Sequence, residues 1–218
     1  MKNLFTTKAE RLAAFKNIDL YPVISSEFTH DRPVLYILEE IAAAGAKIVQ
    51  LREKNKSKKA IYELAVEYRK ITSAHRILLI INDYLDIALA VGADGVHLGQ
   101  DDLPLTVARK LTDALLLGSS THNLPEALAA QTEGADYINI GPVFPTGTKA
   151  VPCGAIGIEA VKNISRQVNI PFTVMGGIKA GHLPELLAIG ATHIAMVTEI
   201  TQAENVKAQT ARLRKFWK

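Results

Sequence analysis

The chain has little of what several classes of protein require. Its one cysteine, Cys153, excludes an internal disulfide and is typical of a protein of the reducing cytoplasm, where we expect this one to act. No apolar run approaches the roughly 18 residues that span a bilayer, and the charged segment 1–17 has no apolar core of signal-peptide length. The formal net charge is only +3, so no sequence-independent grip on nucleic acid is predicted. We therefore expect neither a membrane nor a nucleic acid as partner.

The composition is that of a chain with a sizeable core. With 218 residues, of which 48% are hydrophobic, the length is normal for one α/β barrel. Apolar runs alternate with helical patterns. Strands are predicted at 20–24, 48–52, 78–82, 95–99, 114–120, 137–141, 172–176 and 193–197, and helices at 33–44, 58–74, 84–91, 104–112, 123–133, 157–167, 181–189 and 203–216. Most of the strands read as continuous apolar runs, which is typical of strands buried on both faces.

A short motif recurs at the point where a helix ends and a strand begins. Gly-Ala followed by a strand occurs at 45–49, 92–96, 134–138 and 190–194, and this indicates a repeated α-turn-β unit. Eight strands alternating with eight helices predict a single-domain α/β protein, a (β/α)8 TIM barrel over 20–218. A doubly wound open sheet would normally show a glycine fingerprint after its first strand, where this chain has Ser25 and Ser26. Residues 1–19 are expected to form a short extra helix covering the barrel bottom.

Two acidic residues follow neighbouring predicted strands. Asn82 and Asp83 end the run LLLIIND, and Asp102 follows GVHLGQD. Because active sites of barrels form at the carboxyl ends of the strands, both carboxylates are candidates to hold Mg²⁺ together with substrate phosphate oxygens. The alternative is helix capping, since each residue also precedes a predicted helix. Asp101 is an alternative to Asp102 as the ligand.

Basic residues follow other strands. Arg52 and Lys54 lie two positions apart in QLREKNKSKK, where a guanidinium and an ammonium suit a pyrophosphate, and Lys149 ends the segment GPVFPTGTK. The lysines at 56, 58 and 59 fit a solvated loop better. Gln50 and Glu53 are open to a structural role, and Gln50 also to a hydrogen bond with a heterocycle.

Hydroxyls and glycines follow the last strands. Thr146 and Thr148 lie in a loop that is otherwise an ordinary turn by composition, and Gly176-Gly177 and Val197-Thr198 fall where many barrels bind phosphate through backbone N–H groups. His122 is either a structural residue beside a helix start or an acid/base. Together the strand-end residues predict a divalent cation holding a phosphorylated, pyrophosphate-bearing substrate.

Six segments also occur in the order of a known family. QLREK, IND, GVHLGQDDLP, SSTHN, GADYINIGPVFPTGTK and the GGI of VMGGI resemble the motif set of the thiamine phosphate synthase family, from about residue 20 to residue 200. The resemblance implies a (β/α)8 barrel that joins 4-amino-2-methyl-5-(diphosphooxymethyl)pyrimidine to 4-methyl-5-(2-phosphooxyethyl)thiazole, giving thiamine phosphate and pyrophosphate. It also implies a dissociative mechanism, in which pyrophosphate leaves first and the thiazole nitrogen captures a pyrimidine methylene cation.

The resemblance assigns roles to named residues of this chain. It implies one Mg²⁺ held by Asp83 and Asp102, and a catalytic set of Arg52, Lys54, Lys149 and Ser120. The pyrimidine pyrophosphate site would comprise Gln50, Leu51, Arg52, Glu53, Lys54, Asn82, Ser120 and Lys149. The thiazole phosphate site would comprise Thr146, Gly147, Thr148, Gly177, Val197 and Thr198. A homodimer is also expected.

Two departures and two alternatives accompany this interpretation. Thr198 stands where the family commonly has serine, and segment 150–156 is less charged than the corresponding loop of many members. A related thiazole tautomerase shares the barrel, but the joint presence of Asn82, Asp83, Asp102 and TGTK argues against it. A non-catalytic barrel that binds phosphorylated ligands is the second alternative.

Overall fold

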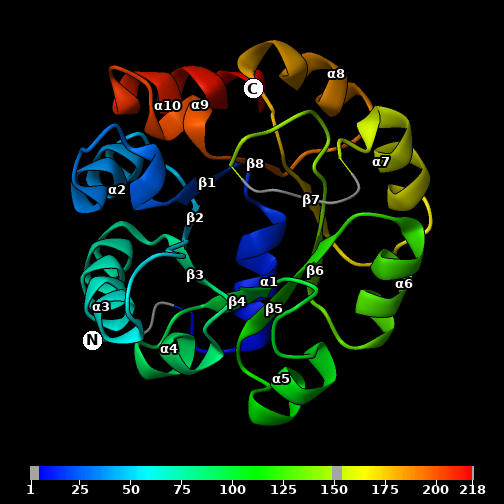
Figure 1. Ribbon diagram of the computed structural model, residues 1–218, viewed down its shortest axis with the longest axis horizontal. Helices are drawn as coiled ribbons and strands as arrows, with labels where there is room; N and C mark the ends of the chain where they lie inside the picture. Colours follow the sequence, from blue (N-terminus) through cyan, green and yellow to red (C-terminus); the bar gives the residue numbers. More distant parts are fainter. Residues whose placement is uncertain (1–4, 149–153, 218) are drawn as a thin grey trace.

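The fold is a closed barrel of eight parallel strands, as predicted. The computed structural model describes residues 5–148 and 154–217. Each strand pairs with its neighbours in sequence order, and β8 pairs with β1 to close the ring (Figure 1). The strands are β1 (Leu20–Ile24), β2 (Ile48–Leu51), β3 (Leu78–Asn82), β4 (Gly95–Leu98), β5 (Leu116–Thr121), β6 (Tyr137–Ile140), β7 (Phe172–Val174) and β8 (Ile194–Met196).

One or more helices follow each strand and lie around the barrel, and one further helix, α1, precedes β1 (Figure 1). They are α1 (Lys8–Lys16), α2 (Val34–Ala43), α3 (Lys58–His75), α4 (Leu85–Ala90), α5 (Leu105–Leu111), α6 (Leu124–Thr132), α7 (Gly157–Ser165), α8 (Leu183–Ala188), α9 (Thr198–Thr201) and α10 (Val206–Arg214), with 3-10 turns η1 (Ser26–Phe28), η2 (Ala180–His182) and η3 (Lys215–Trp217). The predicted helix 203–216 is shorter than expected, because α10 begins only at Val206 after an Asn205 cap, and a separate short helix, α9, follows β8 directly.

The strands are apolar on both faces because two separate layers pack against them. Alternate side chains such as Val49, Leu79 and Ile81 lie in the layer between the barrel and its helices. The intervening side chains, such as Ile48 and Leu78, fill the barrel interior. This explains why the sequence shows continuous apolar runs where a half-exposed strand would alternate.

Helix α1 covers the amino-terminal end of the strands, as expected for the extra helix. A capping box starts it, with Thr7 accepting from the Glu10 amide and the Glu10 carboxylate accepting from Thr7. Its Phe15 is fully buried in the barrel interior, with its ring centroid 4.3 Å from that of Tyr137. Seen down the barrel, α1 lies across the middle of the ring of strands (Figure 1).

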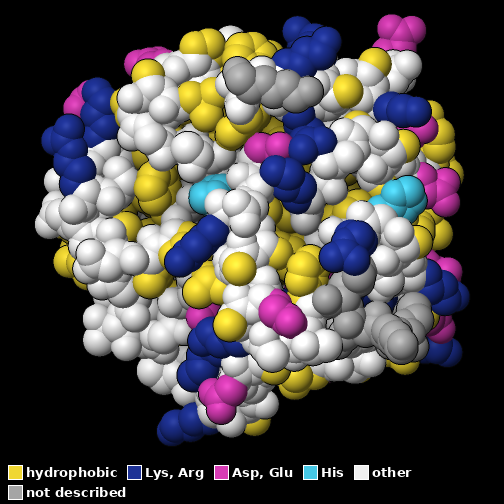
Figure 2. Space-filling view, turned by 180° about the vertical axis from the view of Figure 1, so that it is seen from behind, with side chains coloured by type: hydrophobic (Ala, Val, Ile, Leu, Met, Phe, Trp, Pro, Cys, Tyr) yellow, Lys and Arg dark blue, Asp and Glu magenta, His cyan; other side chains and the backbone are white. Residues whose placement is uncertain are grey.

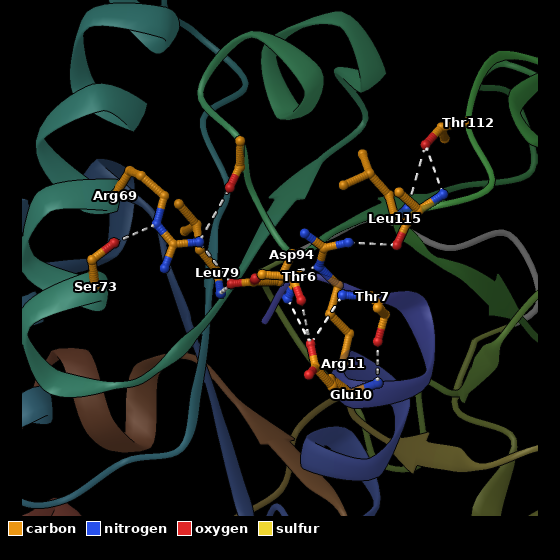
Figure 3. Close-up of polar contacts among 12 residues, drawn as sticks. Thr6, Thr7, Glu10, Arg11, Arg69, Ser73, Leu79, Asp94, Thr112 and Leu115 are labelled. Carbon is orange, nitrogen blue, oxygen red and sulfur yellow. Dashed lines mark hydrogen bonds and ion pairs between the residues drawn. The ribbon is translucent and has the colours of Figure 1, made fainter. Parts of the chain in front are cut away.

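An aspartate after one Gly-Ala motif fastens the bottom of the barrel. Asp94, fully buried before β4, accepts the backbone N–H of Leu79 at the start of β3, 2.9 Å away. Arg69 of α3 lies 2.7 Å from the same carboxylate, and Arg11 of α1 lies 3.5 Å from its other oxygen (Figure 3). One side chain thereby joins four elements: the strands β3 and β4 and the helices α3 and α1.

The next Gly-Ala-Asp motif repeats this arrangement one strand pair along. Asp136, before β6, accepts the N–H of Leu117 in β5 at 2.9 Å and a hydrogen bond from Arg109 of α5 at 2.6 Å. Lys8 of α1 lies 2.7 Å from its second oxygen. In these two copies, the Gly-Ala repeat therefore supplies a turn and is followed by an aspartate that joins neighbouring strands and helices.

The molecular surface seen from behind carries no single dominant charge. In Figure 2 basic and acidic side chains are interspersed among hydrophobic ones. Among the described residues, no helix is both long and apolar enough to cross a membrane.

Candidate functional site

The two predicted carboxylates lie at the carboxyl ends of adjacent strands. Asp83 follows β3 with a left-handed backbone (φ 64°), and its amide donates to the carbonyl of His97 in β4 at 2.9 Å. Asp102 closes a tight turn after β4, accepting the N–H of Gly99 at 2.6 Å. Neither carboxylate caps the helix that follows, because the N-cap residues of α4 and α5 are Tyr84 and Pro104, and neither helix has a side-chain cap. The capping interpretation is wrong for both.

The carboxylates influence each other electrostatically. Burial raises the pKa of Asp83 above its usual range, and the neighbouring Asp102 carboxyl raises it further. Lys54 acts in the opposite direction, since its Nζ lies 2.5 Å from Asp83 Oδ2. Asp83 thus lies beside a like charge with the Lys54 ammonium as its counterion, an arrangement that favours an additional cation.

The donor set fits one kind of metal. Among the described residues, no group of three or more His, Cys, Asp or Glu side chains is placed to hold an ion. Zn²⁺ would need three or four protein ligands. Mg²⁺ commonly takes one or two carboxylates and completes its octahedron with water and substrate phosphates, so Asp83 and Asp102 fit Mg²⁺.

The segment after β2 divides into site-facing and structural residues. Arg52 lies 3.9 Å from the Glu27 carboxylate, beyond hydrogen-bonding distance, so its planar fork is not locked in that pair. The side chain of Leu51 is buried in the layer between strands and helices. Glu53 is also buried and accepts from the amide and the hydroxyl of Ser26, at 3.0 and 2.6 Å, which holds η1 in place. Of Leu51 and Glu53, therefore, only the backbone atoms are available to a ligand.

A cavity that is open to solvent lies over the ends of β5 to β8. It gathers every predicted thiazole-phosphate residue except Gly147, together with Ser120 of the pyrimidine group. The lining residues that matter are Ser120, His122, Asn139, Thr146, Thr148, Gly177, Val197 and Thr198. The Thr146 and Thr148 hydroxyls lie 3.0 Å apart.

The glycine pair lets the long loop after β6 pack on the end of β7. A Cβ on Gly177 would lie 2.3 Å from the Pro145 carbonyl oxygen, and one on Gly176 would lie 2.3 Å from the Pro142 Cβ. Both glycines have positive φ, and the Gly176 carbonyl accepts from the Phe144 amide at 3.0 Å. Any side chain here would push this loop, and the threonines it carries, away from the cavity.

His122 has both a structural contact and a place in the cavity. Its Nδ1 lies 2.7 Å from Glu126, whose carboxylate also accepts the His122 amide at 2.9 Å. Asn123 caps α6 by accepting from the Glu126 amide. His122 is thus anchored to the start of α6 while it lines the cavity wall.

The predicted residues therefore form two neighbouring groups. The metal and pyrophosphate candidates belong to the ends of β2, β3 and β4, and the phosphate-cup candidates belong to the ends of β6, β7 and β8. Ser120, in β5, lies between them: its hydroxyl is 3.0 Å from His97 Nε2 in β4, and its carbonyl accepts from Gln100 at 2.6 Å. Asn82, at the end of β3, is 9% exposed.

Lys149 and Cys153 lie outside the described residues.

Comparison with known proteins decides the family. Residues 20–200 match the family model described as thiamine monophosphate synthase. The chain belongs to the thiamine monophosphate synthase family. The family predicted from the six motifs is confirmed.

Individual relatives agree. A thiamine-phosphate synthase of Shouchella clausii is 43% identical over 199 residues, covering 91% of this chain and 95% of the relative. One of Dictyoglomus thermophilum is 40% identical over 207 residues, covering 94% and 93%. The structure of thiamine phosphate pyrophosphorylase from Pyrococcus furiosus superimposes with a TM-score of 0.84 at 35% identity, covering 91% of this chain and 95% of that one.

Four interior residues near the site were not found from the sequence. Tyr21, His97, Gly118 and Tyr137 lie within predicted strands, where they were read as parts of apolar runs. For the two tyrosines and the histidine the available signal is their polarity, because a tyrosine hydroxyl or an imidazole inside a barrel must find a hydrogen-bond partner.

Proposed function

We propose that this protein joins 4-amino-2-methyl-5-(diphosphooxymethyl)pyrimidine to 4-methyl-5-(2-phosphooxyethyl)thiazole, releasing thiamine phosphate and pyrophosphate. The observation that supports this most is the pairing of two unlike subsites at one end of the barrel. One is an acidic pair with Lys54 and Arg52 beside it, and the other is a cavity walled by Thr146 and Gly177. A reaction with two phosphorylated substrates needs two such places.

The charged subsite suits the pyrimidine pyrophosphate. Arg52 can offer a planar fork to two phosphate oxygens, and Lys54 a point charge. Asp83 and Asp102 would hold Mg²⁺, which when bound supplies positive charge to the departing pyrophosphate. Such a cation would take over the neutralisation of Asp83 that Lys54 provides at 2.5 Å, leaving the ammonium for the phosphate.

The cavity suits the thiazole phosphate. Thr146, Thr148 and Thr198 supply hydroxyls at its wall, and the first turn of α9 follows β8 at the position where barrels bind phosphate through backbone N–H groups. Gly177 keeps the backbone beside the cavity free of a side chain. The two phosphates would then lie in different subsites, with the thiazole ring directed toward the pyrimidine methylene.

No covalent nucleophile is required of the protein. The chain's own contribution is to hold the two substrates in line and to stabilise negative charge on the leaving pyrophosphate as the carbon–oxygen bond breaks. The thiazole nitrogen then captures the methylene cation. We also propose a cytoplasmic location, which rests on the single cysteine, and a homodimer, which rests on the resemblance to the family.

The test is to mix both substrates with the purified protein and Mg²⁺ and to quantify thiamine phosphate and pyrophosphate. Equal amounts of the two products, formed with Mg²⁺ and abolished by a chelator, are expected. Binding of both substrates without any product would favour the non-catalytic barrel. Isomerisation of a thiazole without coupling would favour the tautomerase.

A further inference from the structure

A chain of hydrogen bonds crosses the barrel interior from β2 to β5. Gln50 Nε2 donates to the Tyr21 hydroxyl at 2.9 Å, and that hydroxyl lies 3.2 Å from the hydroxyl of Tyr137. His97 continues the chain, with Nδ1 3.1 Å from the Tyr137 hydroxyl and Nε2 3.0 Å from Ser120 Oγ. The two ends, Gln50 and Ser120, are both candidates for the pyrimidine subsite.

Burial and close packing hold this chain of hydrogen bonds in place within the barrel. The four residues that precede Ser120 in it are between 0% and 5% exposed, so water does not compete for their hydrogen bonds. Gly118 makes room for it: a Cβ there would lie 2.4 Å from the Tyr137 hydroxyl and 2.6 Å from His97 Nδ1. The Phe15 ring packs against Tyr137 from below. The barrel therefore holds its polar groups in one arrangement.

The direction of the hydrogen bonds follows from counting hydrogens. Burial raises the pKa of Tyr21 and that of Tyr137 above the ordinary value, so both hydroxyls keep their hydrogens. Since Gln50 donates to Tyr21, every hydrogen inside the chain finds an acceptor there when Tyr21 donates to Tyr137 and Tyr137 donates to His97 Nδ1. His97 then carries its hydrogen on Nε2 and donates it to Ser120.

We propose that Tyr21, Tyr137 and His97 form a relay that positions Ser120, leaving the hydroxyl hydrogen of Ser120 free to be donated to the pyrimidine pyrophosphate substrate. This inference rests on the proposed function, because it assigns Gln50 and Ser120 to the pyrimidine subsite. The three relay residues are positioning residues. They act through Ser120 and Gln50 without touching the substrate.

The first test needs no substrate and no variant. In the ¹⁵N-labelled full-length protein, the nitrogen shifts of His97 report which ring nitrogen carries the hydrogen. The relay requires a neutral ring protonated at Nε2. A ring protonated at Nδ1 would instead donate to Tyr137 and accept from Ser120 at Nε2, and this would overturn the proposal, whatever reaction the protein catalyses.

The second test removes one hydroxyl from the relay. Tyr137→Phe keeps the ring that packs on Phe15 but breaks the chain. The matched control is Tyr68→Phe, because the Tyr68 hydroxyl is equally buried and has no hydrogen-bond partner among the described residues. Tyr137→Phe should weaken binding of the pyrimidine pyrophosphate, measured by calorimetry without thiazole, by roughly tenfold, the value of one buried hydrogen bond.

The two variants also separate the relay from a general loss of structure. Tyr137→Phe should leave the KM for the thiazole unchanged and abolish the Nε2 preference of His97, while Tyr68→Phe should change none of these. Tyr21→Phe serves as a second variant if Tyr137→Phe fails to fold. Equal behaviour of the relay variants and Tyr68→Phe would refute the relay. A wild-type protein that makes no thiamine phosphate would instead refute the proposed function.

Discussion

The two ends of this barrel treat their charges in opposite ways. At the bottom, Asp94 is fully buried and has two guanidinium groups and a backbone N–H as partners. At the top, Asp83 lies beside a second carboxylate, Asp102, and has Lys54 at 2.5 Å, and burial with that like charge raises its pKa. At the bottom, the charged side chains pair with one another and join strands to helices. The top keeps a like-charge pair that a bound cation would stabilise further, and such a pair at the carboxyl ends of barrel strands indicates a functional site.

The largest effect on activity is expected from the acidic pair. Asp83→Asn and Asp102→Asn should each lower thiamine phosphate formation by at least about a hundredfold, since even the groups that orient a metal's ligands are worth up to that much. The midpoint of thermal unfolding should stay close to that of the wild type. Asp101→Asn is the matched control because Asp101 is exposed on the same turn. Loss of activity in Asp101→Asn, with Asp102→Asn still active, would show that the metal is held by Asp101 and that its assignment to Asp102 is wrong.

The largest effect on stability is expected at the other end. Asp94→Asn leaves Arg69 and Arg11 buried with a weakened partner, and loss of a buried ion pair typically costs about 3–5 kcal/mol in the free energy of unfolding. The control is Glu159→Gln, which breaks an exposed pair with Lys162 and should change that free energy by less than about 1 kcal/mol. Urea unfolding measures both. Similar losses for the two variants would mean that the bottom cluster does not hold the barrel together.

The two subsites of the top face are expected to respond differently to substitution. Arg52→Ala should raise the KM for the pyrimidine pyrophosphate by about ten- to a hundredfold, because a lost charge-assisted contact costs about 1.5–3 kcal/mol. Gly177→Ala should mainly raise the KM for the thiazole phosphate, since its Cβ would lie 2.3 Å from the Pro145 carbonyl. Gly181→Ala is the control, because a Cβ there meets nothing within 4 Å. Equal effects of Arg52→Ala and Gly177→Ala on both substrates would argue against separate subsites.

The smallest effect is expected at His122. Its Nδ1 is 2.7 Å from Glu126, which anchors it to the start of α6. His122→Asn should therefore lower the rate by less than about tenfold, or 1.4 kcal/mol. A loss of several orders of magnitude in a folded variant would mean that a proton transfer through His122 is part of the reaction.

The sequence predicts the fold well because the barrel's requirements are local and repeated. Continuous apolar runs mark strands buried on both faces, and Gly45, Gly92, Gly134 and Gly190 mark helix ends with positive φ. It fails at boundaries, as where β5 runs from Leu116 to Thr121 instead of 114–120, because a strand's ends depend on its neighbours' register.

The site is predicted in part for a related reason. Strand-end residues such as Asp83 are visible because the fold alone brings strand ends together. Tyr21 and His97 are not, since their partners lie on strands far apart in the chain. The resemblance places Glu53 in the pyrimidine site, but its carboxylate accepts hydrogen bonds from Ser26. No local sequence pattern encodes this contact, because it joins two separate loops.

A substrate analogue can test directly whether the top face works by stabilising charge separation. A pyrimidine pyrophosphate with trifluoromethyl in place of the ring methyl keeps the phosphate contacts but opposes positive charge on the methylene carbon. Single-turnover rates and substrate affinities should be measured for both compounds. We expect a rate lower by several orders of magnitude, each tenfold step corresponding to about 1.4 kcal/mol, with affinity little changed. An unchanged rate, with the chemical step limiting, would contradict this expectation and indicate direct displacement by the thiazole.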